Sequence, residues 1–122
     1  MQLIDRVVQF RSEIEAIRRD IHAHPELRYE ENRTSDLVAA RLAERGYDVA
    51  RGLGRTGVVG TLRNGSGTRS IGLRADMDAL PIQEGNDFAH RSRHDGRMHA
   101  CGHDGHTAML LGAAKYLAET RD

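Results

Sequence analysis

Apolar residues recur at helical spacing near the start of the chain. From about residue 5 to residue 23, isoleucine and valine recur at helical spacing, and charged side chains occupy the opposite side. This pattern predicts an amphipathic helix. Pro25 disfavours helical geometry at the residue before it and cannot donate a backbone hydrogen bond, so the helix should end near His24.

Two more helices are predicted by the same spacing. One follows a polar segment, begins with Thr34 or Ser35 as its cap and ends at Gly46. The other lies near the end of the chain, with Asp104 or Thr107 available as its cap. Its apolar positions are Met109, Leu110, Ala113, Ala114 and Leu117.

Strand patterns lie between the second and third helices. Residues 47–51 read as a short strand, and residues 57–63 and 70–75 flank an Asn-Gly-Ser-Gly turn, as the two arms of a hairpin do. Residues 83–98 are polar and irregular. The chain is therefore expected to have an α/β fold whose sheet begins as mixed or antiparallel.

Composition narrows the function classes. The 122 residues suit one domain, and 18 basic residues balance 18 acidic ones, which argues against binding to a phosphate backbone. We expect a cytoplasmic protein without membrane partners, because the sequence has no apolar run of membrane length and no signal-peptide pattern at its start. A single cysteine cannot form an internal disulfide. With 4% aromatic residues, the core should be aliphatic and thin.

Candidate chemistry is concentrated in residues 99–106, which hold three histidines, the only cysteine and one aspartate. Thiolate and imidazole bind zinc and similar divalent ions well, so we expect a metal site. Cys101 and His103 are the natural ligand pair, because side chains two positions apart lie on the same side of an extended segment. Structural zinc modules have repeated pairs from two segments, and this spacing differs from theirs.

A second acidic motif directly follows the predicted strand at 70–75. Asp76 and Asp78 are separated by one position, so either both enter a site or neither does. The end of a strand and the start of a helix are common places for sites in α/β folds, so this motif and residues 99–106 are expected to share a pocket. We expect Asp78 to accept the second N–H of a ligand imidazole. The role of Asp76 stays open.

The remaining histidines have less specific surroundings. His99 and His106 are expected to be structural or to lie beside the ligands. The others should lie at helix ends or on the solvated polar stretch, without a metal role: His22, His24, His90 and His94.

Three segments together resemble a known family. Residues 99–107 (HACGHDGHT) and residues 73–81 (LRADMDALP) resemble the paired signature of the metal-dependent aminoacylase, hippurate hydrolase and auxin-conjugate amidohydrolase family. Residues 18–27 (RRDIHAHPEL), followed by Glu30 and Glu31, are similar to its N-terminal segment.

The resemblance implies a dinuclear metallohydrolase that cleaves the amide bond of small N-acyl amino acids. Residues 1–122 would form the N-terminal part of a zinc-peptidase-like, three-layer α/β/α catalytic domain. Its lid and dimerisation domain and the C-terminal part of the catalytic domain would be absent. Cys101 would bridge two divalent ions, with His103 as a terminal ligand. Zn²⁺ or Mn²⁺ is expected, with Co²⁺ or Ni²⁺ as alternatives.

The same resemblance places the general-base glutamate and the remaining ligands later in the polypeptide. The 122 residues alone are therefore expected to be inactive, and the full-length enzyme could be a homo-oligomer. A different class of function is also open, because the chain could be a small metal-binding or protein-interaction module without catalysis. The reading frame beyond Asp122 distinguishes the two.

Overall fold

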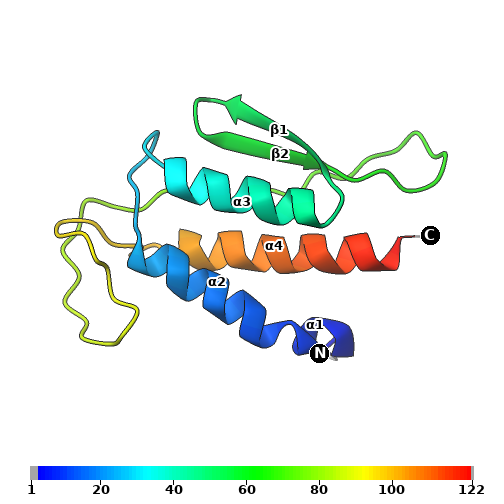
Figure 1. Ribbon diagram of the computed structural model, residues 1–122. Helices are drawn as coiled ribbons and strands as arrows, with labels where there is room; N and C mark the ends of the chain where they lie inside the picture. The colour runs from blue at the N-terminus through cyan, green and yellow to red at the C-terminus, as the bar shows by residue number, and fades with distance from the viewer. Residues whose placement is uncertain (1–2, 122) are drawn as a thin grey trace.

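Helices dominate residues 3–121, the part of the chain that this computed structural model describes. The elements in chain order are α1 (Asp5–Gln9), α2 (Arg11–Ala23), α3 (Asn32–Glu44), β1 (Asp48–Leu53), β2 (Gly57–Thr61) and α4 (His103–Thr120). Helix α4 packs against both α2 and α3, and the β1–β2 hairpin packs on α3 (Figure 1). The predicted α/β class is confirmed.

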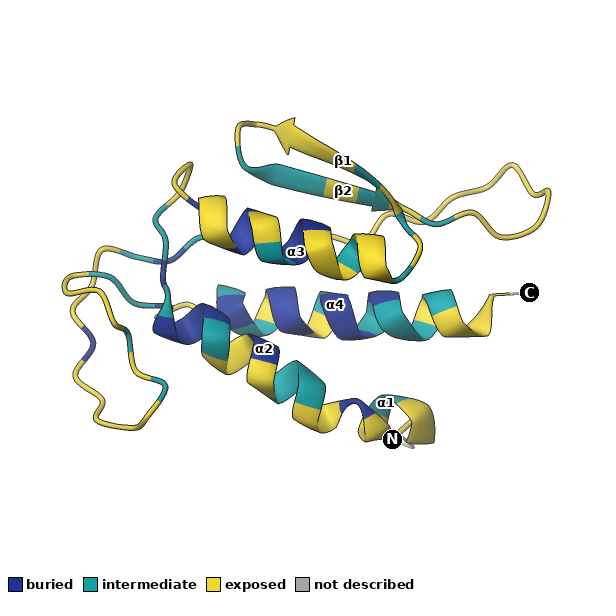
Figure 2. Ribbon diagram, in the orientation of Figure 1, coloured by how far each residue is buried: buried dark blue, intermediate teal, exposed yellow. Residues whose placement is uncertain are grey.

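The core lies where α2, α3 and α4 face one another, as the dark blue faces in Figure 2 show. It is aliphatic, as predicted, and consists of Ile17, Ile21, Val38, Ala108 and Leu111. The helix α4 is confirmed, but Met109 and Leu117 are exposed on it, at 61% and 44%. The position of the neighbouring helices, rather than the spacing alone, decides which face of α4 is buried.

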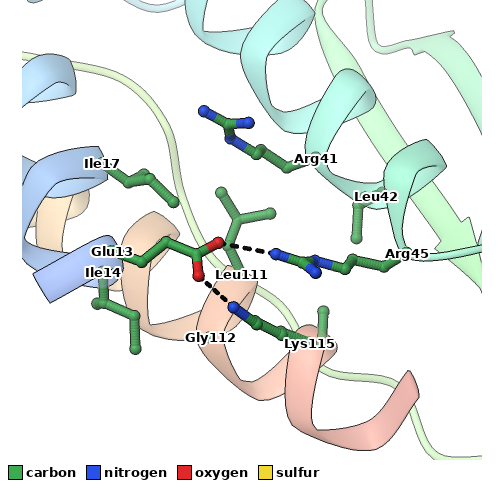
Figure 3. A pocket seen from close by; sticks show the side chains of 10 residues that line it. Glu13, Ile14, Ile17, Arg41, Leu42, Arg45, Leu111, Gly112 and Lys115 are labelled. Carbon is green, nitrogen blue, oxygen red and sulfur yellow. Dashed lines mark hydrogen bonds and ion pairs between the residues drawn. The ribbon is translucent and has the colours of Figure 1, made fainter. Parts of the chain in front are cut away.

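An ionic contact joins the three long helices beside this core. Glu13 of α2 accepts hydrogen bonds from Arg45, just after α3, at 2.8 Å and from Lys115 of α4 (Figure 3). The hydrogen bond from Lys115 is the main reason why the pKa of Glu13 lies below its ordinary value. Close approach of α2 and α4 also depends on Gly112, where an added Cβ would lie 2.5 Å from Ile14 Cδ1.

The predicted first helix is divided in two at Phe10. This residue is 2% exposed, and the cationic groups of Arg6 and Lys115 lie 4.7 and 4.3 Å from its ring centroid. Burying the ring against α4 turns the chain between α1 and α2. The end of α2 at Ala23, just before His24, is as predicted.

The beginning of α3 differs from the prediction. The helix begins at Asn32, so Thr34 lies inside it rather than at its cap. The carboxylate of Glu26 accepts hydrogen bonds from the backbone N–H groups of Arg33 at 2.9 Å and Thr34 at 2.7 Å. A carboxylate from outside the helix therefore satisfies the free donors of its first turn. Gly46, two residues after the last residue of α3, has φ +81°, and the predicted end is confirmed.

The predicted hairpin between residues 57–63 and 70–75 is wrong. β2 pairs with β1 in an antiparallel register that aligns Ala50 with Val59. The connection at residues 54–56 is short and contains two left-handed residues, Gly54 and Arg55, so β1 is the nearer partner. The segment 70–75 forms no strand within the described part of the chain, and its Ile71 is 90% exposed.

The start of α4 also differs from the prediction. The helix begins at His103 after Gly102, whose φ of +108° is left-handed, and neither Asp104 nor Thr107 caps it. Both side chains are buried instead. No helix among residues 3–121 is long and apolar enough to cross a membrane.

Candidate metal centre

The two motifs with candidate ligands meet at the start of α4. Asp76, Asp78 and His103 each offer one ligand atom, and these three atoms lie within 4.8 Å of one another. The two aspartates enter together, as the alternation of an extended backbone predicts. The three side chains are 16–35% exposed, so the cluster is reachable from solvent.

Backbone hydrogen bonds hold the aspartate segment in place. The N–H of Ala79 donates to the carbonyl of Glu26 at 2.7 Å, just after α2. Leu80 and Met98 exchange two bonds of 3.0 Å, which pin the far side of the segment to the loop before α4. Ala79 itself is 3% exposed. The cluster is therefore built on a segment that is fixed on both sides.

The hydrogen bonds of His103 determine which ring nitrogen is free. Nδ1 lies 2.9 Å from the carbonyl oxygen of Asp78 and 2.9 Å from its Oδ1. Both oxygens accept hydrogen bonds, so Nδ1 carries a proton, and in the neutral ring Nε2 keeps its lone pair. A histidine that donates one N–H to a carboxylate and offers the other nitrogen to a metal is a common arrangement in metal sites.

The free nitrogen faces the second aspartate. Nε2 of His103 lies 3.8 Å from Oδ2 of Asp76, too far for a hydrogen bond. Two atoms bound to one zinc ion at roughly 2.0–2.2 Å lie at most about 4.4 Å apart, so this separation suits a shared ion. Asp76 is held by Arg74, which donates to its Oδ1 at 2.6 Å, and by Thr107, which donates to its carbonyl oxygen at 2.8 Å. The donor set of imidazole and carboxylate therefore fits a divalent metal.

Cys101 is the predicted ligand that the structure leaves apart. It is exposed, and the cluster of candidate ligands found among residues 3–121 does not include it. Its ligand role stays a prediction. Conversely, the sequence left the role of Asp76 open, and the structure brings it into the cluster. The signal that could have found it is the shared face with Asp78.

Two neighbouring histidines lie close to the cluster. His106 is exposed, and its ring centroid is 5.5 Å from that of His103. His99 is 4% exposed, and neither ring nitrogen has a hydrogen-bond partner among the described residues. Burial lowers the pKa of His99 despite the opposing effect of the nearby Asp104 carboxylate.

Of the four histidines predicted at helix ends or on the solvated stretch, three are partly or fully exposed, and the fourth is buried. His24 follows α2, with Nδ1 2.8 Å from the carbonyl oxygen of Asp20, and His94 is exposed. His90 is half-buried and stacks on Phe88 at 4.1 Å. His22 lies in the last turn of α2 as expected, but it is 4% exposed and paired with carboxylates. Its carboxylate partners come from distant parts of the chain, Glu84 and Asp104, so its position at the helix end did not predict its burial.

Sequence comparisons identify the family of this chain. Residues 72–122, which include all three clustered side chains, match the peptidase family M20/M25/M40. A hippurate hydrolase from Campylobacter jejuni is 52% identical over 118 residues, which are 97% of this chain and 31% of that protein. The chain belongs to the peptidase family M20/M25/M40.

Two further proteins are similar over nearly the whole of this chain. An N-acyl-L-amino acid amidohydrolase from Geobacillus stearothermophilus is 46% identical over 99% of this chain and 32% of that protein. The crystal structure of a dinuclear metal binding peptidase of the M20 family from Bacillus subtilis matches with a TM-score of 0.87 and 36% identity. That match covers 93% of this chain and 32% of the other. This M20 chain thus spans about a third of the length of these relatives.

Proposed function

We propose that this chain supplies part of a dinuclear metal site that hydrolyses the amide bond of N-acyl amino acids. The observation that carries the proposal is the cluster of Asp76, Asp78 and His103, in which one imidazole nitrogen faces a carboxylate without a hydrogen bond. The names of two relatives, hippurate hydrolase and N-acyl-L-amino acid amidohydrolase, support this substrate class.

Each clustered residue has a separate task in this proposal. A bound divalent ion polarises the amide carbonyl and lowers the pKa of a bound water. His103 offers Nε2 as a ligand, and Asp78 holds the Nδ1 proton and so fixes the ring. Asp76 offers Oδ2. We further propose, from the family resemblance, that the Cys101 thiolate bridges two ions and that His103 is a terminal ligand.

The donor atoms limit the metals that this site would hold. Thiolate and imidazole favour Zn²⁺, whereas carboxylate ligands also suit Mn²⁺, Co²⁺ and Ni²⁺. We place residues 1–122 in the N-terminal part of a three-layer catalytic domain. The general-base glutamate and the remaining ligands belong, in this proposal, to a longer polypeptide that could form a homo-oligomer.

The direct test is release of free amino acid from N-benzoyl and N-acetyl amino acids with Zn²⁺ or Mn²⁺ added. The assay compares the 122-residue chain with the polypeptide encoded by the complete reading frame. We expect metal-dependent turnover by the longer polypeptide, lost in His103→Ala and Cys101→Ala and kept in the control His94→Ala. The shorter chain should stay at background, because loss of a general base alone removes a factor of about 10² to 10⁴.

Two results would contradict the proposal. Metal-dependent turnover by the 122-residue chain, abolished by Cys101→Ala, would show that its residues already form a complete site. No metal-dependent amide hydrolysis by the longer polypeptide would instead favour a non-catalytic metal-binding or interaction module. The 90% exposed Ile71 and 58% exposed Leu73 would then be candidates for its contact surface.

A further inference from the structure

A second histidine lies between two carboxylates on the buried side of α4. Nδ1 of His22 is 2.8 Å from Oδ2 of Asp104, and Nε2 is 3.2 Å from both carboxylate oxygens of Glu84. The three side chains are 5%, 1% and 1% exposed, respectively. The contact joins the last turn of α2, the first turn of α4 and the irregular segment between residues 83 and 98.

Both ring nitrogens of His22 therefore face acceptors. A neutral imidazole has only one N–H, whereas an imidazolium has two and can donate to both carboxylates at once. A neutral ring would leave one nitrogen lone pair directed at a buried carboxylate, which is costly in a medium of low polarity. The geometry thus favours the charged ring.

The surroundings of Glu84 fit an ionised carboxylate. Its Oε1 accepts a hydrogen bond from the backbone N–H of Ser92 at 2.7 Å, and its Oε2 accepts one from the Asn86 amide at 3.0 Å. Burial raises the pKa of Glu84, but these two hydrogen bonds and His22 together outweigh burial and leave that pKa below its ordinary value.

Asp104 has a second cation in reach, and aromatic rings cover His22. Nε of Arg18 lies 3.4 Å from the same Asp104 oxygen that His22 contacts. Phe88, His90 and His99 have ring centroids 5.7, 5.7 and 6.4 Å from that of His22. These rings keep water away from the contact, where charge interactions are stronger than at the surface.

We propose that His22 is a buried imidazolium that bridges Glu84 and Asp104 and thereby positions His103. Asp104 directly follows His103 at the start of α4, so holding Asp104 fixes the first turn of the helix. The first turn in turn sets where the His103 ring meets Asp78. His22 is a positioning residue, and its bridge is a property of the metal-free fold that stands independently of the proposed reaction.

The charge of His22 can be measured directly by ¹⁵N-detected NMR of the histidine rings in the wild-type 122-residue chain at pH 7. We expect both ring nitrogens of His22 to be protonated and each to show a directly bonded hydrogen. His103 should show a protonated Nδ1 and an unprotonated Nε2. An unprotonated nitrogen in His22 would overturn the proposal without any variant being made.

The positioning role is tested by His22→Gln, with His24→Gln as the matched control two residues along. His22→Gln leaves two buried carboxylates without their shared cation, and we expect Tm to fall by about 10 to 20 °C. The double variant His22→Gln, Glu84→Gln removes one of these charges, so it should recover part of the loss and return the His103 ring signals toward those of the wild type.

The control His24→Gln should leave Tm and the His103 ring signals unchanged. An unfolded single variant alongside a folded double variant also supports the proposal, because it attributes the loss to unpaired charge. A double variant no more stable than His22→Gln would contradict the charged bridge. Wild-type His103 signals in a folded His22→Gln would contradict the positioning role.

Discussion

Two clusters, each with one histidine and two carboxylates, meet at the first turn of α4 and differ in what they leave free. His103 has one ring nitrogen bonded to Asp78, while the other lies 3.8 Å from Asp76. His22 has both ring nitrogens within 3.2 Å of carboxylate oxygens. The side chains of the first cluster are 16–35% exposed, and those of the second are at most 5% exposed.

Histidine and carboxylate side chains therefore have different roles in the two clusters. An imidazole with a free nitrogen, accessible from solvent, can take a metal ion. An imidazole with both nitrogens bonded to buried carboxylates holds elements together and has no lone pair to offer a metal. His103 and Asp104 are adjacent in sequence, so one helical turn presents a candidate ligand outward and a structural carboxylate inward. Substitutions should separate stability from metal binding.

The largest expected effect is on stability, from Asp104→Asn in the buried cluster. Removing one partner from a buried charge network should lower the free energy of unfolding by about 3–5 kcal/mol. The matched change Asp76→Asn in the open cluster should alter it by about 0.5 kcal/mol or less. Urea unfolding followed by circular dichroism measures both. Equal losses of unfolding free energy in the two variants would contradict the claim that only the buried cluster holds the fold together.

A smaller effect, on metal binding, is expected from Asp78→Asn. The asparagine keeps the size of the side chain but weakens the hold on the Nδ1 proton of His103, so affinity for Zn²⁺ should fall by about ten- to a hundredfold. Calorimetric titration measures this affinity, and Asp95→Asn, at an exposed position in the irregular loop, is the control. Unchanged affinity would leave Asp78 as a turn residue only.

The smallest expected effect is on the pH dependence of stability. The pKa of Glu84 is lower in the folded chain than its ordinary value of 4.5. Its contribution to stability is therefore present above pH 4.5 and is lost as pH falls through the folded pKa. Wild-type Tm should drop more steeply than that of Glu84→Gln as pH is lowered below 4.5. Parallel curves would show that Glu84 is not ionised in the folded chain.

The elements predicted well from sequence are those whose signals are local. Pro25 ends α2, and Gly46 ends α3, because each restricts or permits a backbone conformation by itself. The alternation of an extended chain predicted that Asp76 and Asp78 either both enter a site or both stay out of it, because residues two positions apart lie on the same side. The structure brings both carboxylates to His103. That Cys101 binds metal stays a prediction.

The features that could not be predicted from the sequence depend on contacts between residues that are far apart in the chain. Asp104 is a good cap residue by type, but in the structure it is buried against His22 and Arg18 of α2. The strand pattern at 70–75 has the right residues but no partner strand among those described. Glu26 caps α3 from outside the helix. The type of a residue limits the structural roles that it can have, and its tertiary contacts determine which of these roles it takes.

The central claim is that the cluster at His103 holds a divalent ion through the free Nε2. Titration of Zn²⁺ into the ¹⁵N-labelled chain, followed by NMR of the histidine rings, tests it most directly. We predict that added Zn²⁺ moves the Nε2 signal of His103 to that of a metal-bound nitrogen, while His22 keeps both ring protons. A His103 signal that stays unchanged while His24, His94 or no histidine responds to Zn²⁺ would contradict the claim.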